Sequence, residues 1–371
     1  MSTAERPGAV RDTTHMRRAL SLARRGWGRT APNPLVGAVV VRDGIVVGEG
    51  FHAEYGSAHA EVAALGDAGE NARGATIYVT LEPCTHHGKT PPCTDALIAA
   101  GVARVVAAVS DPSPTAGGGQ ARLRSAGIDV EVGVEREAAC ELNAPFFHAL
   151  RATRPWMVLK LALSIDGAIA GPSRARGWLT GESARAEVHR LRAGHEAIAV
   201  GLGTVVADDP ALTVRGRAEP RVAPARVVFD DDALIPLDSV LVRTARETRT
   251  IVVVRDPAPE RIAALEARGV SVLAAPTLRQ GLTLLRAEGL RSVLVEGGAG
   301  LAGRLLSDAL VDRLVIFRAP VVLGEGALGA FSHAPGMTLD DAQRLPVIET
   351  RTFGVDTMTV YAMTPTPCSP D

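Results

Sequence analysis

Residues 57–95 read SAHAEVAALGDAGENARGATIYVTLEPCTHHGKTPPCTD, and this stretch decides how the first half of the chain folds. It contains His59-Ala60-Glu61, then Pro83-Cys84 and, after eight further residues, Cys93. The order matches the zinc base-deaminase signature H-x-E followed by P-C-x-x-C, with a longer gap between the cysteines. Zinc prefers tetrahedral nitrogen and sulfur ligands, and a catalytic zinc keeps one position open for water. One histidine and two cysteines therefore predict a catalytic zinc site, with Glu61 moving protons beside it.

Each half of this pattern has an ordinary explanation when taken alone. A His-x-Glu pair usually lies on a solvated helix face, and two cysteines can simply pack in a core. The apolar spacing of AEVAAL predicts that His59 and Glu61 open a helix, whereas ATIYVTLEP predicts a strand ending at Cys84. Cys93 is expected to begin the next helix, and a helix N-terminus lowers the pKa of a thiol. His86 and His87 are rival ligands, but a fourth protein ligand would close the site.

Composition sets the broad class of the protein. The 371 residues exceed what one core usually holds, so two domains are expected. Forty Lys and Arg residues against 41 Asp and Glu give a net charge of −1, which argues against a large nucleic-acid surface. Two of the four cysteines remain, Cys140 and Cys368, which make no disulfide framework and fit a reducing compartment. Without an apolar signal sequence or a membrane-length apolar run, we expect a cytoplasmic protein with no membrane partner.

The first part of the chain alternates between predicted helices and strands. Residues 1–12 are expected to be disordered, and HMRRALSLARRG after them forms an amphipathic helix. The runs VGAVVV and IVVGEG flank an Asp43-Gly44 turn, which predicts a β-hairpin. Alternation over residues 59–134 then predicts an α/β layer with helices on both faces.

A second domain is expected to begin after residues 150–154, because a helical stretch breaks near Pro155 and the alternation restarts. Late in this domain, Gly298–Gly303 satisfies G-x-G-x-x-G between a strand and a helix. Its position excludes the opening unit of a dinucleotide-binding fold. Backbone N–H groups at a helix N-terminus nevertheless bind phosphate, with a tight structural turn as the alternative.

Nine stretches of the chain occur in an order typical of one family. They are Pro32-Asn33-Pro34, His59-Ala60-Glu61-Val62, Thr80-Leu81-Glu82-Pro83-Cys84, Thr90-Pro91-Pro92-Cys93, Lys160-Leu161-Ala162, Asp166-Gly167, Trp178, Ala207-Asp208-Asp209-Pro210 and Glu296-Gly297-Gly298. With them the chain resembles, nearly end to end, the bifunctional riboflavin-biosynthesis deaminase–reductases. The long gap between the two cysteines is normal in that family.

The resemblance implies an α/β protein with a cytidine-deaminase-like three-layer domain over 13–150 and a dihydrofolate-reductase-like domain over 154–364. The substrate is a diamino-hydroxy-pyrimidine that carries a phosphoribosylamino group. The first domain, with Zn²⁺, hydrolyses an amino group off the ring, and the second reduces the ribosyl group to a ribityl chain with NADPH. The expected partners are this small molecule and further copies of the chain, with no nucleic acid.

The resemblance also assigns site residues. It implies His59, Cys84 and Cys93 as zinc ligands and Glu61 as the catalytic proton shuttle. Implied cofactor contacts are Ala162, Trp178, Thr204, Asp208, Asp231, Gly298, Ala299, Gly300, Leu301, Ala302, Gly303 and Arg304. Implied substrate contacts are Asn33, Lys89, Arg176, Arg192, Leu212, Arg215 and Glu296.

Several of these residues have a chemical reason or an ordinary alternative. Arg192 and Arg215 suit a phosphate by bidentate pairing, although this chain has many surface arginines. Lys89 suits the phosphate as a point charge or is a solvated loop lysine. Asn33 reads the substrate or forms a turn, and Trp178 alone would suggest a core residue. The proton donor in the reduction stays open among Lys160, Asp208 and Glu296.

The chain departs from the family pattern at three positions. Arg176 stands where a serine is usual, and Ser113 where an asparagine is usual. Asp231 replaces a serine after the RVV strand, and a carboxylate near the 2′-phosphate of NADPH would repel it. We therefore hypothesise a relaxed preference toward NADH, which a strong NADPH preference would exclude.

Three other functions share the zinc motif. A tRNA or single-stranded nucleobase deaminase is disfavoured by the neutral charge and by the second domain. A non-catalytic module with structural zinc is disfavoured because such sites are usually closed by four ligands. A secondary-metabolism enzyme acting on a related pyrimidine or purine stays open because of Arg176 and Asp231.

Overall fold

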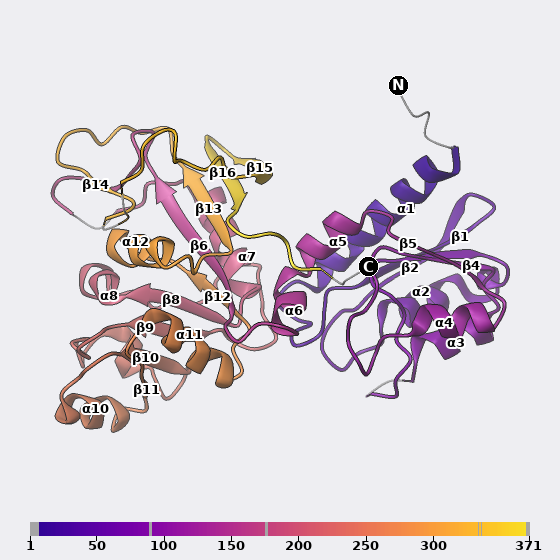
Figure 1. The fold of residues 1–371 in the computed structure, drawn as a ribbon, viewed down its shortest axis with the longest axis horizontal. Helices are drawn as coiled ribbons and strands as arrows, with labels where there is room; N and C mark the ends of the chain where they lie inside the picture. Colours follow the sequence, from indigo (N-terminus) through magenta and orange to yellow (C-terminus); the bar gives the residue numbers. More distant parts are fainter. Residues whose placement is uncertain (1–6, 89–90, 175–176, 333, 335, 369–371) are drawn as a thin grey trace. The chain divides into compact units, whose positions relative to one another are not determined.

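The computed structural model describes residues 7–88, 91–174, 177–332, 334 and 336–368, and the chain forms two compact units (Figure 1). The first unit comprises the residues up to Arg151 together with the C-terminal segment from Thr366. The second unit spans Ala152–Pro365. Our sequence-based division at 150–154 did not include this return of the C-terminal segment to the first unit.

A five-stranded sheet in the order β2-β1-β3-β4-β5 forms the centre of the first unit. β1 is antiparallel to β2 and β3, whereas β3, β4 and β5 are parallel. The predicted hairpin is confirmed, because Asp43 and Gly44 both have positive φ in the turn between β1 and β2. The strands are β1 (Gly37–Arg42), β2 (Ile45–Phe51), β3 (Thr76–Val79), β4 (Arg104–Ala107) and β5 (Asp129–Val132).

Helices cover both faces of this sheet, as predicted (Figure 1). Strand side chains alternate between the faces: Val40 and Ile77 pack toward α2, α3 and α4, whereas Val39 and Tyr78 pack toward α1, α5 and α6. The helices are α1 (Pro7–Ala23), α2 (Ala60–Ala68), α3 (Cys93–Ala100), α4 (Gly119–Ser125), α5 (Arg136–Leu142) and α6 (Ala144–Ala149), with 3₁₀ turns η1 (Arg24–Gly26) and η2 (Gly69–Ala72).

Helix α2 lies very close to β2 because glycines face it. A Cβ at Gly48 would lie 2.4 Å from the carbonyl oxygen of Ala64, and one at Gly50 would lie 2.4 Å from that of Ala60. Gly48 and Gly50 thus allow the close approach of α2, the helix that begins directly after His59 and contains Glu61.

Two expectations about the secondary structure of the first unit are wrong. Residues 7–12 are helical rather than disordered, because α1 begins at Pro7 and Asp12 is buried against Arg104. The strand before Cys84 ends at Val79, and the residues after it bond singly to other segments, Thr80 to the carbonyl oxygen of Gly37 and Glu82 to that of Val109.

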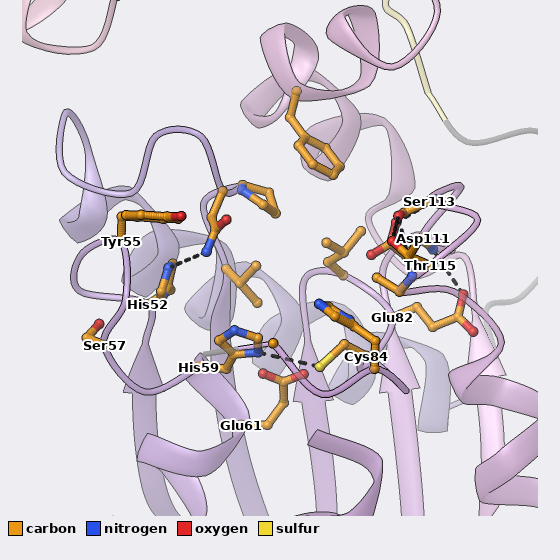
Figure 2. A pocket seen from close by; sticks show the side chains of 18 of the residues that line it. His52, Tyr55, Ser57, His59, Glu61, Glu82, Cys84, Asp111, Ser113 and Thr115 are labelled. Atoms are coloured by element: carbon orange, nitrogen blue, oxygen red, sulfur yellow. Dashed lines mark hydrogen bonds between the residues drawn. The ribbon is translucent and has the colours of Figure 1, made fainter. Parts of the chain in front are cut away.

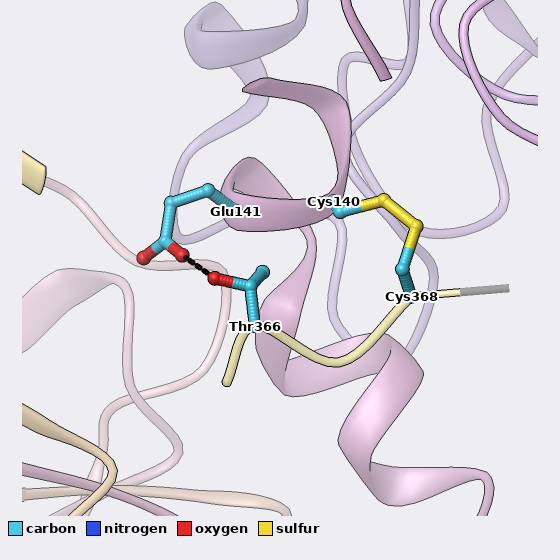
Figure 3. The surroundings of a disulfide bond; sticks show 4 residues. All are labelled: Cys140, Glu141, Thr366 and Cys368. Atoms are coloured by element: carbon cyan, nitrogen blue, oxygen red, sulfur yellow. Dashed lines mark hydrogen bonds between the residues drawn. A yellow bond between two sulfur atoms is a disulfide. The ribbon is translucent and has the colours of Figure 1, made fainter. Parts of the chain in front are cut away.

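The C-terminal segment is joined to α5 of the first unit. Cys140 and Cys368 form a disulfide across a sequence separation of 228 residues, and the Thr366 hydroxyl donates to Glu141 Oε2 at 2.7 Å (Figure 3). Our inference that these two cysteines make no disulfide framework is therefore corrected. Two lone cysteines so far apart in sequence gave no indication that they would meet.

A nine-stranded sheet in the order β11-β10-β9-β8-β12-β6-β13-β16-β15 forms the second unit, beside a two-stranded β14-β7 sheet. The strands from β11 to β13 are parallel, and β16 and β15 extend the sheet antiparallel. The strands are β6 (Trp156–Leu163), β7 (Ala168–Ala170), β8 (Ala197–Gly201), β9 (Ala225–Phe229), β10 (Thr250–Val254), β11 (Ser271–Ala274), β12 (Ser292–Val295), β13 (Arg313–Arg318), β14 (Leu328–Gly329), β15 (Val347–Phe353) and β16 (Asp356–Ala362).

The helices of the second unit also pack on both faces of its sheet. α11 and α12 contribute to one core, and α8, α9 and α10 to the other. The helices are α7 (Glu182–Ala193), α8 (Leu202–Asp208), α9 (Val240–Arg243), α10 (Pro259–Glu266), α11 (Leu278–Ala287) and α12 (Ala299–Ser307). Among the described residues, none of the helices has the length and apolarity needed to cross a membrane.

Candidate active sites

The three predicted zinc ligands converge in the first unit. His59 immediately precedes α2, Cys93 is the first residue of α3, and Cys84 lies in the loop between β3 and α3. His59 Nδ1 lies 3.2 Å from Cys93 Sγ and 3.6 Å from Cys84 Sγ. Bonds of usual length to a tetrahedral zinc place nitrogen and sulfur ligands roughly 3.5 Å apart. The donor set and its spacing therefore fit zinc.

The surroundings of Cys84 favour a thiolate at this residue. A hydrogen bond with Cys93 lowers the pKa of Cys84 against the opposing effect of burial, and His59 lowers this pKa further. The backbone N–H of Cys93, at the N-terminus of α3, also points to Cys84 Sγ at 3.4 Å. Since zinc binds the thiolate form, these contacts prepare the ligand.

Glu61 lies beside the ligands in the first turn of α2 and lines the same cavity (Figure 2). Its side chain is 4% exposed, and burial raises the pKa of its carboxyl group to about 7. A carboxyl group with this pKa can both accept and release a proton near neutral pH.

A cavity of about 520 Å³ opens above these residues. Asn33 lies in its wall, and His52 fixes the Asn33 amide. His52 Nδ1 lies 3.1 Å from the carbonyl oxygen of Ala58, which can only accept, so Nδ1 carries the proton. His52 Nε2 then accepts from Asn33 Nδ2 at 3.2 Å, which leaves the Asn33 carbonyl oxygen for another partner. This contact supports substrate reading by Asn33 rather than turn formation alone.

The opposite wall carries Asp111, Ser113 and Thr115 (Figure 2). The carboxylate of Glu82 holds this wall, because it accepts from the backbone N–H groups of Asp111 and Gln120, both at 2.9 Å. Burial raises the pKa of Asp111 to about 6.

The rival zinc ligands do not join the cluster. His86 lines the cavity and His87 is exposed, and the metal-binding group in the described part of the chain contains only His59 and the two cysteines. Lys89, a predicted phosphate contact, lies outside the described residues, so its role stays a prediction.

In the second unit, three charged side chains meet: Lys160 of β6, Arg192 of α7 and Glu296, which follows β12. Arg192 pairs with Glu296 through two contacts of 2.5 and 3.0 Å, and Lys160 Nζ lies 3.8 Å from Glu296 Oε2. Burial lowers the pKa of Lys160. Burial acts to raise the pKa of the Glu296 carboxyl group. The positive charges of Arg192 and Lys160 outweigh this effect, so the pKa of Glu296 is lowered.

The other predicted substrate contacts surround the same cluster. Arg192 donates to the carbonyl oxygen of Thr213 at 2.8 Å, and Arg215 Nε donates to the Thr213 hydroxyl at 3.2 Å. Leu212, just before Thr213, is buried with φ 49°. The structure therefore brings Arg192, Arg215 and Glu296 together around one loop. Arg176 lies outside the described residues.

Thr204 and the predicted cofactor contacts of the Gly298–Gly300 turn form a group at the N-terminus of α12. A Cβ at Gly298 would lie 3.4 Å from Thr204 Oγ1, whereas one at Gly300 would meet nothing within 4 Å. This end of α12 therefore offers open backbone N–H groups, which fit the phosphates of a dinucleotide. Gly303, later in α12, packs directly against the backbone of Ser332. The side chains of Ala299, Leu301 and Ala302 are buried.

Two further predicted cofactor contacts lie after β9 and at the end of α8. Asp231 follows β9 and pairs with Arg304 of α12 and with Arg255 after β10. Asp208 ends α8, the helix that carries Thr204.

Ala162 and Trp178 have neighbours other than this group. Ala162 lies on β6 opposite Phe317 of β13. Trp178 is 74% exposed, with the guanidinium carbon of Arg185 5.4 Å from its ring centroid, which excludes the alternative of a core tryptophan. Their contact with a cofactor stays a prediction.

Sequence reasoning missed His52, Glu82 and Asp111 as residues that shape the site. A sequence signal for Glu82 was available, because this residue belongs to the family motif Thr80-Leu81-Glu82-Pro83-Cys84. His52 and Asp111 follow strands β2 and β4, and the carboxyl ends of strands are where sites form in α/β sheets.

Two family models match the chain. The model of the cytidine and deoxycytidylate deaminase zinc-binding region matches residues 10–109, and that of the RibD C-terminal domain matches residues 155–358. The first match contains all three zinc ligands, and the second contains the cluster of Lys160, Arg192 and Glu296.

Curated relatives and solved structures cover nearly the whole chain. The riboflavin biosynthesis protein RibD of Escherichia coli is 44% identical over 372 residues, which cover 94% of this chain and 98% of that protein. RibD of Aquifex aeolicus is 44% identical over 85% of this chain and 88% of its own.

Solved structures of full length are also similar. A structure of Acinetobacter baumannii RibD has a TM-score of 0.82 at 37% identity, covering 95% of this chain and 99% of that one. A Thermotoga maritima diaminohydroxyphosphoribosylaminopyrimidine deaminase/5-amino-6-(5-phosphoribosylamino)uracil reductase has a TM-score of 0.81 at 33% identity, covering 97% and 100%. The first unit thus has the cytidine-deaminase-like three-layer fold, and the second has the dihydrofolate-reductase-like fold of these enzymes.

Proposed function

The chain belongs to the RibD family, and from this premise we propose which of its residues carry out each of two reactions. It is a bifunctional riboflavin-biosynthesis enzyme that uses zinc and NADPH. The deaminase hydrolyses an amino group off diaminohydroxyphosphoribosylaminopyrimidine, and the reductase converts the ribosyl group of the product to a ribityl chain.

In the first unit, His59, Cys84 and Cys93 hold the zinc and Glu61 moves the protons. Zinc held there would supply an activated water as the nucleophile. Glu61 would accept a proton and deliver one to the departing amine, which leaves as ammonia. Its buried place beside the ligands supports this role.

The cavity walls orient the pyrimidine for this step. The carbonyl oxygen of Asn33, turned away from His52, accepts a hydrogen bond from a ring N–H or amine. On the facing wall, Glu82 fixes the backbone that carries Asp111 and Ser113. Lys89 meets the ribose phosphate as a point charge.

In the second unit, the N-terminus of α12 and Thr204 bind the phosphates of NADPH, with Arg304, Asp208, Asp231, Ala162 and Trp178 around the cofactor. NADPH supplies the hydride, so the protein mainly positions the reactants. Lys160 and Glu296 form the proton-handling pair, which their separation of 3.8 Å supports. Arg192, Arg215, Leu212 and Arg176 contact the ribose phosphate end of the substrate.

The observation that carries the deaminase assignment is the convergence of His59, Cys84 and Cys93, at a cavity that His59, Cys84 and Glu61 line. The test is incubation of the purified protein with diaminohydroxyphosphoribosylaminopyrimidine, with and without NADPH, followed by mass spectrometry. We expect only the deaminated product without NADPH and the ribityl product with it. A substrate that stays unchanged under both conditions would contradict the assignment.

Three finer points stay proposals. The protein works as a homo-oligomer, it works in the cytoplasm, and it needs no nucleic-acid or membrane partner. Sedimentation equilibrium tests the first point, since a monomer at micromolar concentration would exclude it.

A further inference from the structure

Asn143 lies between α5 and α6 and uses its side chain to hold a distant piece of backbone. Its Oδ1 accepts from the N–H of Leu35 at 2.8 Å, and its Nδ2 donates to the carbonyl oxygen of Leu35 at 2.9 Å. The side chain is 3% exposed, and 108 residues separate the two partners. One carboxamide thus satisfies both backbone groups of one residue, as a neighbouring strand would.

Leu35 lies within the segment that forms one wall of the deaminase cavity. Asn33, Pro34 and Val36 line the cavity, whereas the Leu35 side chain is buried elsewhere. β1 begins only at Gly37, and before it the sheet contributes one backbone bond, from the His52 N–H to the carbonyl oxygen of Val36 at 2.9 Å. The two contacts from Asn143 hold Leu35, the residue before Val36.

Asn143 also joins this segment to a second piece of the same wall. Phe146 lines the cavity and follows Asn143 by three residues, so both lie on the same side of α6. A shift of α6 relative to Leu35 would therefore change the distance between Phe146 and Asn33 across the substrate.

We propose that Asn143 is a positioning residue for the deamination, which sets the substrate-contacting segment Asn33–Val36 and Phe146 against the zinc side of the cavity. The inference rests on the deaminase function proposed above and names a residue that acts through others. Two buried backbone groups without partners are costly, so a change at position 143 forces the segment to move or to admit water.

The test compares Asn143→Leu with wild type in ammonia release from diaminohydroxyphosphoribosylaminopyrimidine. Leucine has a similar volume but no polar atom, so both contacts to Leu35 are lost. We expect KM to rise about tenfold and kcat to change by less than about threefold, because the loss concerns binding geometry rather than the reacting groups. Zinc content, the absorption spectrum of the cobalt-substituted protein and the reductase rate should stay at wild-type values. Asn71→Leu, the same change at an exposed position of η2, is the matched control.

A double-mutant cycle separates positioning from general support of the fold. If Asn143 acts through Asn33, Asn143→Leu should raise KM much less in an Asn33→Ala background than alone. Additive effects, or an unchanged KM in the zinc-loaded single variant, would overturn the proposal.

If Asn143→Leu does not fold, the same measurements are made on Asn143→Asp, which keeps the acceptor for the Leu35 N–H. A wild-type protein that releases no ammonia would overturn the deaminase function and this inference together, whereas equal wild-type and variant kinetics would overturn this inference alone.

Discussion

The carboxylate of Asp231 accepts two hydrogen bonds from the guanidinium of Arg304, at 3.2 and 3.4 Å. Arg255 also approaches Oδ2 of this carboxylate, at 3.4 Å. The negative charge of Asp231 is thus compensated by two cations, so it repels a cofactor phosphate less than the sequence suggested. It also occupies two guanidinium groups that could bind that phosphate.

Replacement of Asp231 by serine should strengthen the preference for NADPH. The change frees Arg255 and Arg304 for the 2′-phosphate and removes one negative charge beside it. We expect the ratio of kcat/KM for NADPH to that for NADH to rise about five- to tenfold, about 1 kcal/mol. Steady-state kinetics with both cofactors measure it, with the exposed neighbour Asp232→Ser as control. An unchanged ratio would place the 2′-phosphate elsewhere, and a strong NADPH preference of the wild type would end the hypothesis of relaxed specificity.

Loss of the Cys140–Cys368 disulfide should destabilise the first unit. The bond closes a loop with a sequence separation of 228 residues and fastens the C-terminal segment to α5. We expect Cys368→Ser to lower the free energy of unfolding by about 2–4 kcal/mol, because the unfolded chain gains freedom. Denaturation followed by tyrosine and tryptophan fluorescence measures this. A reducing agent should bring the wild type to the level of the variant, and a wild type indifferent to the reducing agent would show that the bond contributes nothing.

Stability in acid should depend on Asp12. Burial acts to raise the pKa of Asp12, but hydrogen bonds from Arg104 and Tyr78 outweigh it and keep this pKa below its ordinary value. A carboxylate with a lowered pKa stabilises the fold at pH values above its unfolded pKa, about 3.9, and this stabilisation is lost as pH falls through the folded pKa.

We therefore expect Asp12→Asn to lower the free energy of unfolding by about 1–3 kcal/mol at pH 7, and by progressively less below pH 4. Urea denaturation at several pH values checks this. A difference between the two proteins that is the same at pH 7 and pH 3 would show that Asp12 acts by packing and not by charge.

The zinc ligands and the hairpin could be predicted because their signals are local. His59, Glu61, Cys84 and Cys93 occur in a fixed order within 35 residues, and Asp43-Gly44 supplies the positive φ values that its turn needs. The residues Gly298–Gly300 likewise predicted a helix N-terminus with open backbone N–H groups, because a predicted strand precedes them and a predicted helix follows.

Contacts between distant segments could not be predicted from one sequence. Asn143 meets Leu35 across 108 residues, and Asp12 meets Arg104 across 92. Asn, Asp and Arg are common on surfaces, and only the packing of α1 and α6 against the sheet brings these particular ones into the interior. For the same reason, the helical start at Pro7 and the return of the C-terminal segment were missed.

The account depends most directly on Glu61 as the proton carrier beside the zinc ligands. Replacement by glutamine keeps the size and the polar contacts but removes the group that accepts a proton. The exposed Glu70→Gln is the matched control, and zinc content and the reduction of the deaminated compound report on the integrity of each unit.

The decisive measurement is the rate of ammonia release by zinc-loaded Glu61→Gln. We predict a fall of about 10²–10⁴-fold relative to wild type, with stoichiometric zinc and unchanged reduction. Deamination at the wild-type rate by this variant would contradict the account.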